Sequence, residues 1–350
     1  MGSPLGPYDA LRRIGYLLER SRAGTYRVKA FRGAAATVLA TNPAELRSRA
    51  AAGTLTDLPG IGPATEGVIR AALEGEIPEY LTSLEAKATE PLVAGGLEVR
   101  AALRGDLHSH SDWSDGGSSI QEMVVTAMDL GHEYLVLTDH SPRLTIANGL
   151  SSERLSRQLR VIEKINLAVG EFRLLKGIEV DILDDGSLDQ SALMLSQLDL
   201  RVASVHSKLA MSQAPMTRRL IAAVENPHTN ILGHCTGRLV EGERGIRSQS
   251  SFDAAAVFAA CAAHDVAVEI NSRPERCDPP DDLMVVAHDA GCLFSIDSDA
   301  HAPGQLDFLI YGCARAERLA VPVERIVNTW PLDRLLAWAN TAAGGSRFGD

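Results

Sequence analysis

The chain has 350 residues, 45% of them hydrophobic, and a formal net charge of −11 at pH 7. This length can bury a sizeable core and leaves room for one large and one small domain. No window approaches the roughly eighteen apolar residues that a bilayer crossing needs, and the N-terminal sequence lacks the layout of a secretory signal. We therefore expect a cytoplasmic protein with no membrane partner.

The negative charge is unevenly distributed along the chain. Residues 12–49 contain nine Arg and Lys residues against two acidic ones, so the remainder is strongly acidic. An acidic body suits cation binding, and a basic segment suits an anionic polymer. The five cysteines are widely spaced and form no CxxC, which disfavours both a disulfide framework and a thiolate zinc site.

Residues 1–86 show helical periodicity and predict a small all-helical domain. Helices are expected over residues 8–20, 26–41, 43–53 and 64–75. A Gly/Pro turn, Leu58–Pro63, precedes the last of them. Residues 87–104 have weak periodicity and a glycine pair, which is typical of a linker.

Residues 105–345 predict a second, larger domain in which short apolar runs alternate with helical ones. Strands are expected at residues 102–108, 133–140, 173–180, 200–206, 230–235, 266–271 and 292–301. Seven β-then-α units predict a parallel α/β barrel, closed or nearly closed. An open doubly wound sheet is the second choice, because no GxGxxG follows the first strand. Further helices are expected after Ala302.

Side chains that bind metals stand at the ends of these strands. In an α/β barrel the loops at the C-terminal strand ends converge on one pocket. Six of the ten histidines stand there with one Glu and two Asp, and the set is His108, His110, Asp115, His140, Glu179, His206, His234, Asp299 and His301. Capping or an ion pair explains any one of them. Their recurrence at every strand end but one instead predicts a shared metal site.

Nine ligands exceed what one ion uses, so we expect two or three divalent ions. Histidine mixed with carboxylate, without cysteine, favours Zn²⁺, Mn²⁺ or Fe²⁺. Such ions lower the pKa of a bound water and polarise a phosphoryl oxygen, which is the chemistry of phosphoester hydrolysis. Asp106, two residues before His108, is a candidate for orienting a ligand.

These motifs resemble the polymerase-and-histidinol-phosphatase (PHP) family of metal-dependent phosphoesterases. The matching motifs are DLHSHSDWSDG, LTDHS, GIEVDIL, VASVHSK, GHCTGRL, VEINSRPERCD and DSDAH. Within the family the likeness is to the C-terminal PHP domain of bacterial family-X DNA polymerases. YRVKAFRGAAATVL and LTDLPGIGPATEGVIRAALEGEIPEYL resemble the helix-hairpin-helix domain of the same polymerases, whereas residues 87–104 are too few for a polymerase palm. DNA synthesis is therefore not expected.

The resemblance implies a distorted (β/α)7 TIM-like barrel with a small N-terminal helix-hairpin-helix domain. It also implies three ion positions, with Mn²⁺ preferred over Zn²⁺ or Fe²⁺. The first would be held by His108, His110, Glu179 and Asp299, the second by Glu179, His206 and His234, and the third by Asp115, His140 and His301. Lys208, Arg238, Arg273 and Arg276 are candidates for gripping a substrate phosphate, with ordinary surface cations as the alternative.

The hairpin has a physical reading of its own. Gly60 and Gly62, on either side of Ile61, permit positive φ and close backbone approach, so helix N–H groups can face a phosphate. Arg27, Lys29 and Arg32 would add sequence-independent phosphate contacts. The alternative is a tight turn used only for packing. The helix that follows contains no lysine, so the Schiff-base lyase chemistry of related eukaryotic repair polymerases is not expected.

We therefore expect a metal-dependent phosphodiesterase that acts on DNA, as a 3′-5′ exonuclease or 3′-end-processing enzyme of DNA repair. Its partner would be the DNA backbone at 3′ ends, with DNA repair proteins as further partners. One alternative is a small-molecule phosphomonoesterase of the histidinol-phosphatase type. The other is a non-catalytic DNA-binding protein whose barrel is a relic.

Overall fold

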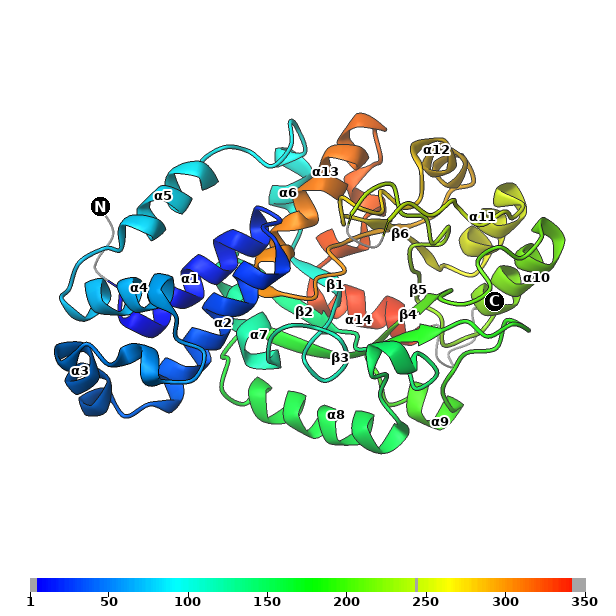
Figure 1. The fold of residues 1–350 in the computed structure, drawn as a ribbon. Coiled ribbons are helices and arrows are strands. Elements are labelled where there is room, and N and C mark those ends of the chain that lie inside the picture. Colours follow the sequence, from blue (N-terminus) through cyan, green and yellow to red (C-terminus); the bar gives the residue numbers. More distant parts are fainter. Residues whose placement is uncertain (1–4, 243–244, 342–350) are drawn as a thin grey trace. The chain divides into compact units, whose positions relative to one another are not determined.

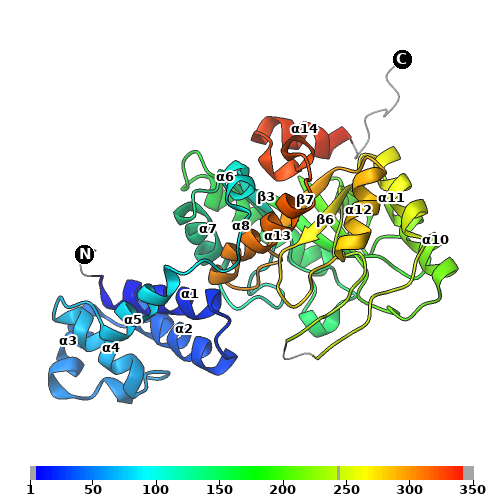
Figure 2. The same cartoon turned by 90° about the horizontal axis from the view of Figure 1, so that it is seen from above.

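The computed structural model describes residues 5–242 and 245–341. The chain forms two compact units, and the boundary between them along the sequence lies between Pro91 and Leu92. We call them the N-terminal unit and the barrel unit. Figures 1 and 2 show the elements of both in two views. Within the described ranges, no helix has both the length and the apolar character that a membrane crossing requires.

The N-terminal unit is all-helical, as expected. Its helices are α1 (Pro7–Arg20), α2 (Thr25–Ala40), α3 (Pro43–Ala52), α4 (Pro63–Leu73) and α5 (Glu79–Ala88), with a short 3-10 turn at Leu55–Asp57. The core between them includes the buried side chains of Leu11, Ile14, Phe31 and Ile69. Local sequence sets the helix ends: the Asn42 side chain accepts a hydrogen bond from the Ala44 N–H at the start of α3.

A buried ion pair joins α1 to α2. Arg32 Nε and Nη2 donate to the two carboxylate oxygens of Glu19 at 2.8 and 2.7 Å. The two side chains are only 11% and 4% exposed. Arg32 was expected to contact DNA, but its guanidinium is turned into the unit and held by Glu19. We therefore assign Arg32 to packing and remove it from the DNA-contacting set.

The segment expected to be a linker, residues 87–104, is partly structured. It contains α6 (Leu97–Ala102), which packs against α13 (Leu309–Arg318) of the barrel unit. Gly96 precedes α6 with a φ of +79°, and a Cβ there would lie 2.5 Å from the Ala314 nitrogen. Its N–H donates to Glu317 Oε2 at 2.7 Å. Residues 92–104 thus belong to the barrel unit.

The barrel unit contains a seven-stranded parallel sheet with its strands in sequence order. The strands are β1 (Gly105–Ser109), β2 (Tyr134–Leu137), β3 (Arg173–Asp181), β4 (Leu200–Ser204), β5 (Ile231–Leu232), β6 (Ala267–Asn271) and β7 (Phe294–Asp297). A parallel bridge from Ser109 to Ala300 links the first strand to the chain that follows the last. The expected distorted barrel of seven strands, nearly closed, is confirmed.

Helices surround these strands (Figure 1). They are α7 (Ile120–Asp129), α8 (Ser152–Asn166), α9 (Ala192–Leu195), α10 (Gln213–Val224), α11 (Ala254–Ala263), α12 (Asp281–Asp289), α13 and α14 (Leu332–Thr341). Short 3-10 turns lie at Thr145–Ala147, Pro303–Phe308, Val323–Arg325 and Val327–Thr329. The expected helices after Ala302 are present as far as Thr341, and residues 342–345 of the predicted domain lie outside the described ranges.

Alternate strand residues enter two different hydrophobic clusters. Leu135 and Leu137 pack in the large cluster with the helices, whereas Val136 packs in a second one with Trp330 and Leu335. The second cluster closes the end of the barrel where the strands begin, and Figure 2 shows α14 at that end. This plug leaves the opposite end, where the strands finish, for polar side chains.

The Glu19–Arg32 pair leads to a stability prediction. Arg32→Ala should destabilise the N-terminal unit by about 3 kcal/mol, because it leaves a buried carboxylate uncompensated. Arg49→Ala is the matched control: it removes an exposed pair with Glu45 on α3 and should cost about 0.5 kcal/mol or less. Hydrogen exchange of the α1 and α2 amides measures both, and equal protection in the two variants would contradict the prediction.

Candidate metal centre

The structure gathers all nine predicted ligands at the C-terminal ends of the strands. His108 and Glu179 lie on β1 and β3, and the others follow the ends of β1, β2, β4, β5 and β7. Three sets place one ligand atom per residue within 4.8 Å of one another: His110, Asp115, His140 and His301; His108, His110 and Asp299; His140, Glu179 and His206. His110 and His140 each belong to two sets, so the sets form one continuous centre.

Glu179 lies at the middle of this centre and is 1% exposed. Its carboxylate oxygens lie within 2.8 to 3.6 Å of a ring nitrogen of five histidines, which are His108, His110, His140, His206 and His234. Burial would raise the pKa of Glu179, but the charges of the surrounding imidazoles outweigh burial and hold that pKa well below its usual range. The carboxylate is therefore ionised and faces several ligand groups at once.

The buried polar atoms here fit metal ligation. His108 Nε2, Glu179 Oε2, His206 Nε2 and both ring nitrogens of His110 make no hydrogen bond. Buried polar atoms in native proteins are almost always paired, so such a group points to an ion. Burial, with the charges of His301 and His140, lowers the pKa of His110 to about 3. The ring is thus in the neutral state that binds metals.

Glu269 on β6 is a site residue that the sequence interpretation missed. Its Oε1 lies 2.6 Å from His108 Nδ1, and its Oε2 accepts from the His234 backbone N–H at 2.5 Å. Asp106, which we expected to orient a ligand, accepts hydrogen bonds from the His108 backbone and from Ser298. Glu269, not Asp106, therefore orients the His108 ring. Its alternation with Asn271 on the strand was the available signal.

Three other side chains support the ligands from behind. Asp181 Oδ1 lies 3.3 Å from His206 Nδ1. Arg273 Nη1 lies 2.9 Å from His301 Nδ1, and Asn271 Nδ2 donates to Asp299 Oδ2 at 3.1 Å. Such outer contacts fix ring orientation and leave the inner nitrogen free for an ion.

The four predicted phosphate-gripping cations lie in different surroundings. Arg276 Nε lies 3.1 Å from Asp299 Oδ2, and Arg273 pairs with Glu275 at 2.6 Å. Arg238 donates to the backbone carbonyls of Arg276 and Cys277, which fixes the loop after β6. Lys208 is exposed and ion-paired with Asp184. Arg276 and Arg273 are thus the two that border the ligands directly.

Arg247 is a further cation that the sequence interpretation did not single out. It is exposed, and its Nε donates to the Gly237 carbonyl at 2.7 Å. Partial desolvation of its guanidinium and the positive charge of Arg276 lower the pKa of Arg247.

The N-terminal hairpin has the expected positive φ at only one of its two glycines. Gly60 adopts a φ of +76°, whereas Gly62, the N-cap of α4, is extended with a φ of −115°. The Gly62 N–H donates to Thr65 Oγ1, and the Ile61 side chain is buried in the core of the unit. Ile61 therefore serves packing, and one of the amides expected to face a phosphate is already engaged.

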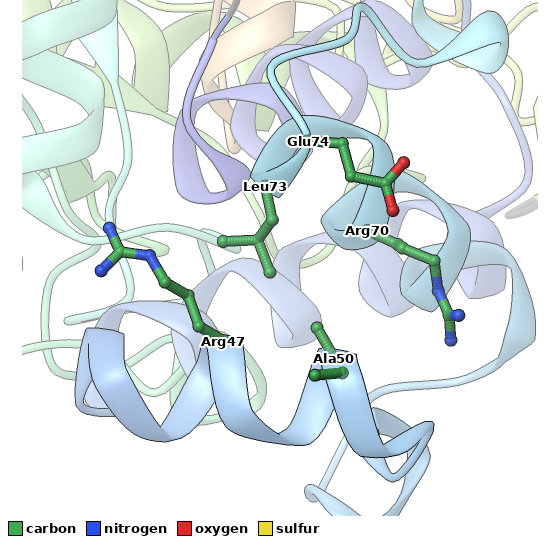
Figure 3. Close-up of a pocket in the computed structure, with 6 residues that line it drawn as sticks. Arg47, Ala50, Arg70, Leu73 and Glu74 are labelled. Carbon is green, nitrogen blue, oxygen red and sulfur yellow. The ribbon is translucent and has the colours of Figure 1, made fainter.

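Arg27 and Lys29 on α2 are exposed, as a surface for an anionic polymer requires. A separate pocket of about 240 Å³ lies between α3 and α4. In Figure 3 Leu73 points toward Ala50, and the guanidinium groups of Arg47 and Arg70 extend in opposite directions. Glu74 also lines this pocket, and Arg70 pairs with Glu66 at 2.6 Å. The positive charges of Arg47 and Arg70 in this pocket are therefore partly compensated by nearby carboxylates.

Two buried carboxylates beneath the ligands have raised pKa values. Burial raises the pKa of Asp297 to about 7, and the negative charges of Glu269 and Asp106 add to the rise. Burial also raises the pKa of Asp106 to about 6. An acid with a raised pKa binds more protons when folded than when unfolded. Its stabilising contribution is therefore complete below about pH 4 and is lost as the pH rises toward 7.

Asp297→Asn tests this sign in the metal-free protein. The amide imitates the protonated acid and carries no charge at any pH. The free energy of unfolding of the variant minus that of the wild type should therefore increase between about pH 4 and pH 7 and remain constant at higher pH. Denaturant unfolding in a chelator at several pH values measures the difference, and a difference that does not change with pH would contradict the prediction.

Part of the chain is similar to known proteins. The DNA polymerase/3'-5' exonuclease PolX of Bacillus subtilis (strain 168) is 36% identical over 226 residues, which are 65% of this chain and 39% of that protein. The chain thus spans well under half the length of that relative. The Probable phosphatase YcdX of Escherichia coli O139:H28 is 28% identical over 236 residues, which are 65% of this chain and 90% of that protein.

Among solved structures, the histidinol phosphate phosphatase HISK of Lactococcus lactis subsp. lactis Il1403, complexed with zinc, L-histidinol and phosphate, matches with a TM-score of 0.43 and 16% identity. The match covers 63% of this chain and 93% of that one. The family model described as the PHP domain matches residues 106–273, which include seven of the nine gathered ligands. Residues 106–273 of the barrel unit are therefore a PHP domain.

Proposed function

We propose that this chain is a metal-dependent phosphodiesterase that acts on DNA, as a 3′-5′ exonuclease or 3′-end-processing enzyme in DNA repair. The observation that carries the proposal is the gathering of eight other nitrogen and oxygen ligands around the buried carboxylate of Glu179. Two or three ions fit this number of ligands, and Mn²⁺ is the preferred one, with Zn²⁺ or Fe²⁺ as alternatives. The three ligand sets would each hold an ion, and they share His110 and His140.

Each group of side chains has a separate task in hydrolysis. Divalent ions in this centre would lower the pKa of a water and polarise a phosphoryl oxygen. Glu179 holds the ligand sets together, and Glu269, Asp181 and Arg273 keep the imidazole rings aimed inward. Arg276, whose Nε lies 3.1 Å from Asp299 Oδ2, would supply positive charge where a phosphate adds negative charge in the transition state.

The N-terminal unit favours a polymer over a small molecule as the substrate. Arg27 and Lys29 are exposed, and the hairpin between Leu58 and Pro63 brings glycine backbone to the surface. These features suit contacts to a nucleic-acid backbone, and a small phosphate ester has no use for them. The relative named as a 3'-5' exonuclease supports the same substrate.

A small-molecule phosphomonoesterase is the second candidate. The relative named as a probable phosphatase favours it, because this chain covers 90% of that protein. The same metal chemistry serves monoesters and diesters. The two candidates differ in whether the N-terminal unit affects turnover.

Loss of a central ligand should abolish the reaction. With Mn²⁺, the wild type should release nucleotides from the 3′ end of a 5′-labelled primer-template. Glu179→Gln and His108→Ala should each lower the rate about 10³-fold or more, because both disturb the ligand sets. His288→Ala, which alters a partly exposed histidine on α12, is the control and should leave the rate unchanged. A wild type inactive on this substrate, or ligand variants as active as the control, would contradict the proposal.

Charge reversal on α2 separates the two candidates. Arg27→Glu with Lys29→Glu should lower DNA cleavage at 0.1 M salt at least tenfold and leave hydrolysis of an aryl phosphate unchanged. Arg160→Glu with Lys164→Glu, on the exposed side of α8, makes the same change in charge and should have little effect. Equal effects of the two double variants on DNA would favour the phosphomonoesterase.

A further inference from the structure

The loop after β1 carries Asp115, the most exposed of the four ligands in its set. Its side chain is 36% exposed, whereas that of His140 is 7% exposed. Asp115 Oδ1 nevertheless lies 3.4 Å from His140 Nε2 and 3.3 Å from His301 Nε2. A loop carboxylate must lose conformational freedom to stay in such a place. Some other contact must therefore hold this loop.

Asp139, the residue before His140, provides that contact. Its Oδ1 accepts from the Ser111 N–H at 2.8 Å and from the Ser114 hydroxyl at 2.5 Å. Its Oδ2 accepts from the Ser111 hydroxyl at 2.6 Å and from Gln158 Nε2 at 2.5 Å. A carboxylate has about four acceptor positions, and all four are filled. Asp139 is 1% exposed.

The same loop is held from its outer side by α8. The Trp113 carbonyl accepts from Arg154 NH2 and from Asn148 Nδ2. Arg154 and Gln158 are four residues apart, so they lie on one face of α8. One helix therefore reaches both the loop backbone and the carboxylate of Asp139.

The turn itself leaves little room for another conformation. The Gly116 N–H donates to the Ser111 carbonyl at 2.9 Å, and a Cβ on Gly116 would lie 2.6 Å from the Ser111 carbonyl carbon. Asp139 holds the Ser111 side of this turn, and Asp115 directly precedes Gly116. Fixing Ser111 and Ser114 therefore fixes Asp115.

We infer that Asp139 is the positioning residue for the ion held by His110, Asp115, His140 and His301. It joins the loop of one ligand to the strand end of another, so the set is formed before an ion binds. Preorganisation of this kind raises affinity by removing the entropy loss from the binding step. The inference rests on the metal centre proposed above, and not on the identity of the substrate.

Three variants test it. Ser114→Ala removes one of the four donors, and Asp139→Asn replaces two acceptor positions with donors while keeping the shape. Ser118→Ala is the matched control, because Ser118 is buried in the same loop and its hydroxyl makes no hydrogen bond. Each protein is stripped with a chelator and titrated with Mn²⁺ alone by calorimetry, and the unfolding midpoint of the stripped protein is recorded.

In Ser114→Ala and Asp139→Asn, one class of Mn²⁺-binding sites, the one that contains Asp115, should bind the ion about 10- to 100-fold more weakly. The affinity of the remaining Mn²⁺ sites should equal that of the wild type in both variants. The unfolding midpoint of stripped Ser114→Ala should also equal that of the wild type. Ser118→Ala should match the wild type in every Mn²⁺ affinity and in its midpoint. Wild-type affinities in Ser114→Ala and Asp139→Asn would overturn the inference, as would equal weakening of every Mn²⁺ class. Selective loss of one class in a protein inactive on DNA would sustain this inference while the proposed function failed.

Discussion

The structure depends on one buried carboxylate. Glu179 is almost fully removed from water, and five imidazoles approach its two oxygens. A lone buried charge is strongly unfavourable, so Glu179 requires these positive or metal-bound partners around it. The backbone of the neighbouring strands also allows these partners to come close to Glu179. A Cβ at Gly177, two residues before Glu179, would lie 2.5 Å from Val136 Cγ1, so only glycine permits β3 to approach β2 this closely. That approach places His140 beside Glu179, where the two residues form a parallel bridge.

The barrel separates stability from chemistry along its axis. At the end where the strands begin, Leu107, Val136 and Val202 pack with Trp330 in a closed apolar plug. The Tyr134 hydroxyl donates to the Asn328 and Trp330 carbonyls and ties the plug to the sheet. At the opposite end the inward positions hold ionisable side chains. The ionisable end is thereby shielded from water below, which strengthens every electrostatic contact in it.

The sequence predicted the parts of this molecule that repeat. Seven apolar runs predicted the barrel, and ionisable side chains at all but one of their ends predicted the nine ligands, because strand ends in a barrel share one pocket. Asp181 was missed because it is a single charged residue with no local pattern to distinguish it. Glu269 was missed although it alternates with Asn271 on the sixth strand, because that strand contributes no ligand. Arg32 was misjudged for a related reason. A basic stretch of sequence does not show that Glu19, on another helix, occupies one of its cations. The predicted linker included α6 because a helix of six residues, Leu97–Ala102, is too short for helical periodicity to be visible in the sequence.

The central claim is that Glu179 is the shared point of a multi-ion centre. Crystals grown with Mn²⁺ and measured at the manganese absorption edge test it most directly. The account predicts at least two anomalous peaks, each within about 2.3 Å of several of the nine ligands, with Glu179 bound to one or bridging two. No anomalous peak within 3 Å or so of Glu179 at saturating Mn²⁺ would contradict the account.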